Sequence, residues 1–168
     1  MAVTIGVSFL LVIPIEFLIV PTALFGGMMI GYYANARADR RGGPWGRVIA
    51  NALFAGLVTG LSLAVLYLAV KGLFFMADDG YRDASAGGRL TCETGPDCVY
   101  QRYLAFHGAE VLEAQGVSDV DTFTQFYWTQ QLSQAGSFLA LSLGGSLIGG
   151  LMYGATNRRK PEEGETAA

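Results

Sequence analysis

The stretch FLALSLGGSLIGGLMYG, residues 138–154, decides the fold of this chain. It contains five glycines and no charged residue. Gly145 and Gly149 are four residues apart, as are Gly150 and Gly154, so each pair lies on one face of a helix where another backbone can approach closely. The pattern predicts a membrane-spanning helix that packs through small residues.

Two further apolar runs, residues 3–33 and 48–76, show the same device. Each has a pair of glycines at the same spacing, Gly27 and Gly31 in the first run and Gly56 and Gly60 in the second. The first run would extend roughly 46 Å as a helix, longer than a hydrocarbon core of ~30 Å, so we expect it to tilt or to bend at its prolines. It is too long, and lacks the basic start, for a signal peptide.

Composition agrees with a membrane protein. Of the 168 residues, 52% are hydrophobic and only 15% are charged, whereas soluble domains have about 25% charged residues. With 11 lysines and arginines in all, we expect no nucleic-acid-binding surface. The predicted fold is an all-α integral membrane protein with three transmembrane helices and a small, disulfide-containing helical outer segment between the second and the third.

Basic residues indicate the topology. They cluster in the connector 34–47 and after the third run: Arg37, Arg40, Arg41 and Arg47, then Arg158, Arg159 and Lys160. Since such residues mark the cytoplasmic side, we expect the N terminus outside and the C terminus inside, in a prokaryotic plasma (inner) membrane. Binding of anionic lipid is the alternative role of these arginines. The predicted parts are helix 1 (1–33), a cytoplasmic basic loop (34–47), helix 2 (48–76), an extracytoplasmic acidic segment (77–134), helix 3 (135–157) and a cytoplasmic tail (158–168).

The outer segment 77–134 has nine acids, three arginines and both cysteines of the chain. Cys92 and Cys98 lie close together around a Gly-Pro turn, on the predicted outer side, which favours a disulfide over a metal site. Within the segment we expect a helix capped by Asp97 that ends near Gly116, with His107 packed on its apolar face.

A second outer helix, capped by Ser118 or Asp119, is expected to continue without a break into the third span. Its early aromatic residues resemble an interfacial belt: Phe123, Phe126, Tyr127 and Trp128.

Two charged residues lie within the apolar runs. Glu16 is costly in a span and therefore has a purpose. Either it pairs with Lys71 or a partner protein, or it binds protons or a cation during transport. GGMMIG (26–31) of the first span also matches GGSLIG (144–149) of the third span at four of six positions. This similarity indicates either a parallel repeat or, as we prefer, convergence on small-residue packing.

The sequence contains no arrangement typical of a catalytic site, and we expect neither an enzyme nor a bound cofactor or metal. The predicted function is that of a non-catalytic accessory or structural subunit, in contact with the lipid bilayer and with other membrane proteins or copies of itself. A glycine seam that points away from the other helices would favour this role. The alternative is a channel or transporter component that uses Glu16, and a third option is a ligand-binding outer segment.

Overall fold

The computed structural model describes residues 16–38, 44–77 and 92–157, and this part of the chain is all-helical, without strands. The helices are α2 (Glu16–Arg37), α3 (Trp45–Ala77), α4 (Pro96–His107), α5 (Ala109–Glu113) and α6 (Val120–Thr156). They form two compact units: the first comprises Met1–Val65 and Ala135–Ala168, and the second comprises Leu66–Gln134. Helices α3 and α6 contribute residues to both units.

Within the part of the chain that the structure describes, two helices, α3 and α6, are long and apolar enough to cross a membrane. α3 contains the whole predicted second span, and α6 continues without interruption from Val120 through the predicted third span. The first fifteen residues of the predicted first span lie outside the described part of the chain, so α2 represents only its second half.

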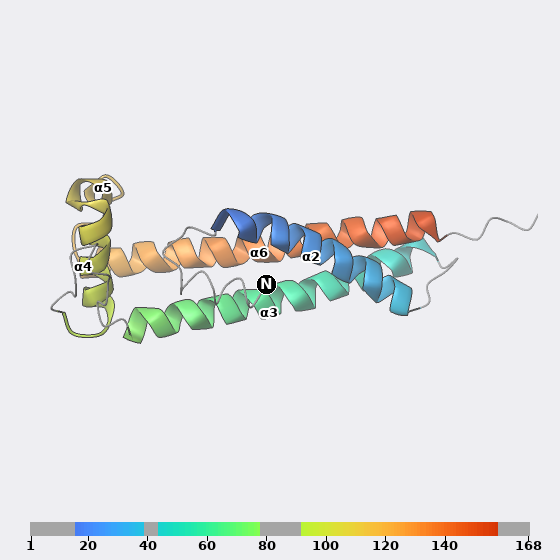
Figure 1. The fold of residues 1–168 in the computed structure, drawn as a ribbon, viewed down its shortest axis with the longest axis horizontal. Helices are drawn as coiled ribbons and strands as arrows, with labels where there is room; N and C mark the ends of the chain where they lie inside the picture. The colour runs from blue at the N-terminus through green and yellow to red at the C-terminus, as the bar shows by residue number, and fades with distance from the viewer. Residues whose placement is uncertain (1–15, 39–43, 78–91, 158–168) are drawn as a thin grey trace, which may run out of the picture. The chain divides into compact units, whose positions relative to one another are not determined.

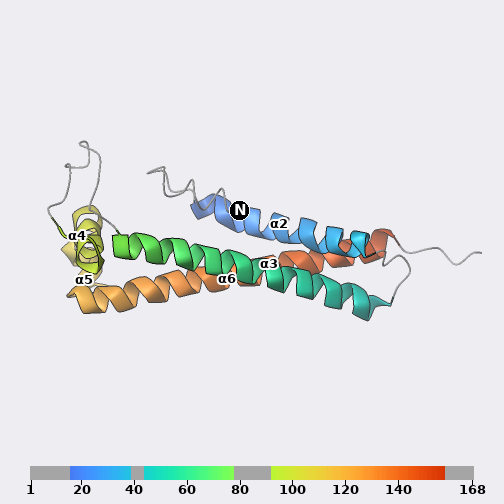
Figure 2. The ribbon, with the colours of Figure 1, turned by 90° about the horizontal axis from the view of Figure 1, so that it is seen from below.

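The first unit is a bundle of α2, the first part of α3 and the last part of α6. α2 and α6 run in the same direction and α3 runs in the opposite direction (Figures 1 and 2). The faces that meet are rich in small residues, with Ala23 and Ala52 completely buried, and the larger Phe138 and Tyr153 are buried beside them. Small side chains allow the helix backbones to come into contact, and this close approach replaces the interlocking of large side chains found in most soluble bundles.

The second unit has an aromatic and aliphatic core. Its buried members come from α3, α4, α5, α6 and the α5–α6 connection: Phe75, Val99, Leu112, Val117, Phe123 and Tyr127. α4 lies across the start of α6 (Figure 1), and its Tyr100 and Tyr103 pack on Phe123 with ring centroids 5.2 and 5.0 Å away. Large rings fill this unit, whereas the contacts between α2 and α6 in the first unit are made largely at glycine and serine.

The single outer helix predicted from Asp97 to Gly116 is wrong in detail. Gly108 adopts a φ of +83°, which L side chains rarely adopt, and separates α4 from α5. The cap position before α4 is Gly95, followed by a proline, and Asp97 is exposed and accepts a hydrogen bond from the Gln101 side chain at 2.8 Å. His107 is exposed beside Tyr103, not packed in the core.

The interpretation of the α6 aromatics as an interfacial belt does not fit Phe123 and Tyr127, which are buried, whereas Phe126 and Trp128 are partly exposed. Phe123 and Tyr127 are 0% and 5% exposed, because residues four apart share a helix face and this face is turned towards Phe75 of α3. The Phe75 ring stacks on Tyr127 with centroids 4.7 Å apart and meets Trp128 edge-on at 5.6 Å. These aromatics form the core of the second unit.

Candidate functional site

The closest packing in the first unit is between α2 and α6. A Cβ atom added at Gly27 would lie 2.6 Å from the carbonyl oxygen of Ser142, and one at Gly31 would overlap that of Ser146. From the other side, Cβ atoms at Gly145 and Gly149 would overlap the carbonyl oxygens of Leu24 and Met28. Backbones this close allow Cα–H to carbonyl contacts, which are common where helices meet through glycine.

These contacts are reciprocal. When GGMMIG is aligned on GGSLIG, Gly27 corresponds to Gly145, and the same alignment pairs Leu24 with Ser142. Gly27 lies on Ser142 while Gly145 lies on Leu24, so each helix presents the same local surface to the other. Gly31 and Gly149 are related in the same way through Ser146 and Met28. The shared motif thus has a packing role, and no ancestral repeat is needed to account for it.

The remaining predicted seam glycines contact α3 and α6. Gly56 and Gly60 of α3 lie against the α6 backbone and side chains around Ser142. On α6, a Cβ at Gly150 would lie 2.6 Å from that of Ala52, and one at Gly154 would lie 2.6 Å from the Trp45 ring. All eight predicted glycines therefore face neighbouring helices of the same chain.

Among the described residues of the first unit, the buried side chains of Asn35, Ser142 and Ser146 each donate a hydrogen bond to a backbone carbonyl, whereas the buried Tyr153 hydroxyl has no hydrogen-bond partner. Ser146 donates to Ala52 at 2.7 Å, and Ser142 donates to Gly56 at 3.4 Å. Asn35 donates to Gly31 at 3.0 Å and to Val48 at 3.3 Å. Its Oδ1 accepts from the Asn51 side chain at 3.4 Å, so these groups connect α2, α3 and α6.

Among the charged residues predicted within the spans, Lys71 is half-buried on α3, and its Nζ lies 5.6 Å from the centroid of the Tyr67 ring. This distance is within the range of a cation–π interaction. Glu16 is the first residue of α2, but its side chain lies outside the described part of the structure. The predicted pairing of Glu16 with Lys71 therefore stays a prediction.

The predicted topology-determining residues are described only in part. Arg37, in the last turn of α2, and Arg47, in the first turn of α3, are both exposed. The other basic residues lie outside the described ranges: Arg40, Arg41, Arg158, Arg159 and Lys160. Cys92 and Cys98 lie at bonding distance with Cα atoms 5.2 Å apart, as the sequence predicted for a disulfide.

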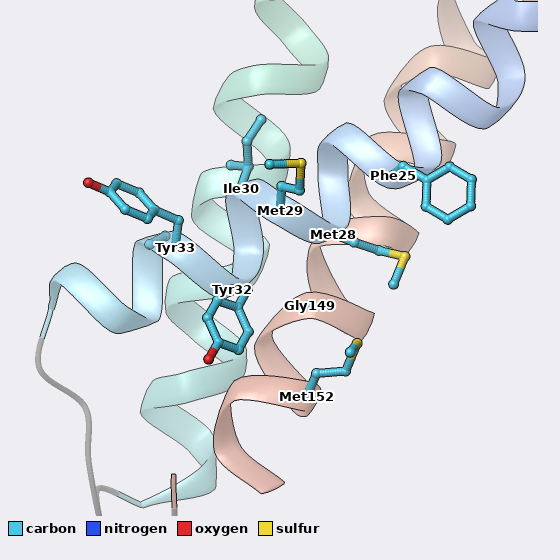
Figure 3. Close-up of a pocket in the computed structure, with 9 residues that line it drawn as sticks. Phe25, Met28, Met29, Ile30, Tyr32, Tyr33, Gly149 and Met152 are labelled. Atoms are coloured by element: carbon cyan, nitrogen blue, oxygen red, sulfur yellow. The ribbon is translucent and has the colours of Figure 1, made fainter. Parts of the chain in front are cut away.

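An apolar groove of about 690 Å³ opens on the surface of the first unit (Figure 3). Its walls come from α2 between Phe25 and Ala34, and Gly149 and Met152 of α6 complete it. A smaller hollow of about 490 Å³ in the second unit is lined by residues 115–117 before α6, by neutral polar side chains of α6 and by Phe126. No charged residue lines either of these two hollows.

Sequence reasoning missed two groups of contacts. The buried serines of α6, Ser142 and Ser146, are four residues apart. This is the same spacing as that of the glycine pairs, and it is the sequence signal that could have identified them. In the second unit, the Tyr67 hydroxyl donates to Oε1 of buried Gln131 at 2.6 Å. A lone glutamine in a polar stretch gives no sequence signal for such a partner 64 residues away.

No protein-family model, curated protein or solved structure gives a significant match to this chain. The functional proposal therefore rests on the geometry of the first unit.

Proposed function

We propose that this chain is a non-catalytic integral membrane protein with three spans that serves as a structural subunit of a membrane complex, built with other membrane proteins or with copies of itself. The observation that carries the proposal is the state of the buried polar groups in the first unit. Asn35, Ser142 and Ser146 each donate to a backbone carbonyl of a helix. Polar groups used in this way hold helices together.

The outward-pointing glycine seam that would favour this role is not found, because all eight glycines face helices of their own chain and so supply no surface for a partner. The exposed apolar side chains of α2 and α3 are the candidate surface instead. On α3 they include Leu53, Phe54, Leu57, Val58, Leu61 and Val65. In a bilayer this surface contacts either lipid or a neighbouring helix, so the proposed partner is another membrane-embedded helix.

The proposed topology has α2, α3 and α6 in the three spans, with the Arg37–Arg47 end of the bundle in the cytoplasm of a prokaryotic cell. The direction of the helices supports it, because α2 and α6 run parallel and α3 antiparallel (Figure 1). A chain that crosses a membrane three times has this alternation. The exposed positions of Arg37 and Arg47 at one end agree with the positive-inside rule.

The transport alternative depends on Glu16. Replacement of Glu16 by Gln keeps the size of the side chain and removes its charge. If Glu16 pairs with Lys71 or a partner, Glu16→Gln reduces assembly or thermal stability. If assembly is intact and a proton or cation flux through reconstituted protein disappears, Glu16 acts in transport and the structural proposal is wrong.

Native mass spectrometry of the full chain, extracted from its own membranes in mild detergent, tests the subunit proposal. We expect the chain in a defined assembly with other polypeptides or with a fixed number of its own copies. Leu57→Gln and Leu61→Gln place polar groups on the exposed α3 face and should weaken that assembly. Gly144→Ala is the matched control, because a Cβ there meets nothing within 4 Å. A chain that is monomeric under all extraction conditions contradicts the proposal.

A further inference from the structure

Backbone atoms of α2 and α6 form the floor of the apolar groove in the first unit. At Gly149 the two helices are so close that a Cβ atom would overlap the Met28 carbonyl oxygen. Met28 and Met152 stand on either side of this point, with Phe25 towards one end and Tyr32 towards the other (Figure 3). Methionine side chains are flexible and polarizable, and they adapt to chains of variable shape. The groove is thus open, elongated and apolar.

The length of the groove matches one leaflet of a bilayer. From Phe25 to Tyr33, α2 rises about 12 Å, and half of a hydrocarbon core is about 15 Å. Phe25, Met29 and Tyr33 are 60%, 74% and 63% exposed. They follow one another at a spacing of four along the α2 surface, so they form a continuous apolar stripe beside the groove.

The stripe ends in a cation. Arg37 is one turn beyond Tyr33, is exposed and lies in the last turn of α2. No acidic residue occurs in α2 after Glu16, so within this helix the arginine is the charge nearest to the groove. Tyr32 and Tyr33 have the apolar ring and polar hydroxyl typical of the membrane–water interface. A guanidinium group is well suited to bind a phosphate.

We infer that the groove binds an anionic phospholipid, with an acyl chain along α2 between Phe25 and Tyr33 and the headgroup phosphate on Arg37. This inference rests on the proposed membrane topology, which places the Arg37 end in the cytoplasmic leaflet. It goes beyond the proposed function because it names a bound lipid and its site. Charge complementarity selects an anionic lipid over a zwitterionic one, and the groove distinguishes this site from a diffuse basic surface.

Native mass spectrometry of the purified full chain with added phosphatidylglycerol or phosphatidylcholine of the same acyl composition tests the inference. We expect one phosphatidylglycerol to bind in clear preference to phosphatidylcholine. Arg37→Gln should weaken phosphatidylglycerol binding about fivefold, the contribution of one arginine near an anionic headgroup, and should leave phosphatidylcholine binding unchanged. Met152→Trp fills the groove at a half-exposed position and should weaken both lipids.

Arg47→Gln is the matched control, since Arg47 is also exposed but lies in α3, which contributes no residue to the lining of the groove. Equal losses in Arg37→Gln and Arg47→Gln, or equal binding of the two lipids by the unaltered chain, overturn the inference. A dimer that Met152→Trp dissociates assigns the groove to a second copy instead. Release of the chain from membranes by alkaline carbonate would contradict the membrane topology itself, and with it both proposals. Retention in the membrane without lipid preference removes only this inference.

Discussion

At the scale of single residues, the glycines of the first unit differ in what surrounds them. Gly149 faces the backbone of α2, while Gly144, five positions earlier on α6, faces nothing within 4 Å. A rule based on glycine content treats the two as equal. The spacing of four residues separates them correctly, because it selects the face that another helix can approach.

We expect Gly149→Ala to destabilise the bundle, because one methyl group would push apart two backbones that cannot give way as a side chain would. Overpacking of this kind costs about 1–3 kcal/mol. Gly144→Ala should be neutral or slightly stabilising, since alanine favours a helix over glycine. Thermal unfolding of both variants in mild detergent, followed by circular dichroism, measures the difference. Equal midpoints for the two variants would show that α2 and α6 are not in backbone contact.

Asp119 is the second residue with a local role. Its Oδ1 accepts a hydrogen bond from the Thr122 backbone amide at 2.8 Å, and the Thr122 hydroxyl accepts one from the Asp119 amide at 3.1 Å. This reciprocal arrangement caps α6. The bonds from the Thr122 backbone and side chain lower the pKa of the Asp119 carboxyl from its ordinary value of 3.8.

Because the pKa of Asp119 is lowered in the folded chain, the stabilisation is present above the unfolded value and is lost as pH falls through the folded value. We therefore expect amide exchange in the first turn of α6 to rise below about pH 4. Asp119→Asn keeps an accepting oxygen but cannot ionise, so its exchange, after correction for the intrinsic pH effect, should not show this rise. Hydrogen exchange with mass spectrometry compares the two. The same pH profile in both would assign the rise to other carboxyl groups.

At the scale of elements, the long helices were predictable and the short ones were not. Apolar runs with small residues at a spacing of four predicted α3 and the last part of α6 closely, and the cap at Ser118 or Asp119 predicted where α6 starts. The break at Gly108 was missed because a glycine within a helical pattern is ambiguous until its φ is known. The α6 aromatics resemble a belt at the lipid interface when only the sequence is considered. Their contact with Phe75, which lies 48 to 53 residues earlier, has no signal in the sequence. Partners distant in sequence decide burial, and no local pattern carries that information.

The contact between α3 and α6 in the second unit makes a further prediction. Tyr67→Phe removes the hydroxyl that donates to Gln131, and the Gln131 side chain is only 4% exposed. Loss of a donor to a buried amide oxygen costs about 1–3 kcal/mol. Replacing both residues, as Tyr67→Phe with Gln131→Leu, removes the polar pair together and should recover part of the loss. If the double variant is less stable than Tyr67→Phe, the Tyr67–Gln131 hydrogen bond is not what stabilises this contact between α3 and α6.

At the scale of the whole molecule, charge and cysteine placement suggest one orientation. The basic connector and tail contrast with the acidic segment 77–134, and both cysteines belong to that segment. A disulfide between Cys92 and Cys98 is expected to persist on an oxidising side of the membrane. The two arguments are independent, because one concerns insertion of the chain and the other concerns redox chemistry.

Their agreement can be tested with the natural cysteines. In intact cells, a membrane-impermeant maleimide should not label the chain until a membrane-impermeant reductant is added, after which both cysteines should react. Replacement of both, as Cys92→Ser with Cys98→Ser, is the control for labelling elsewhere. In inside-out vesicles the same reagents should leave the chain unlabelled. Labelling in inside-out vesicles alone would place the acidic segment in the cytoplasm and reverse the proposed orientation. In that case Arg37 would lie in the outer leaflet, and the lipid it selects would have to be sought there.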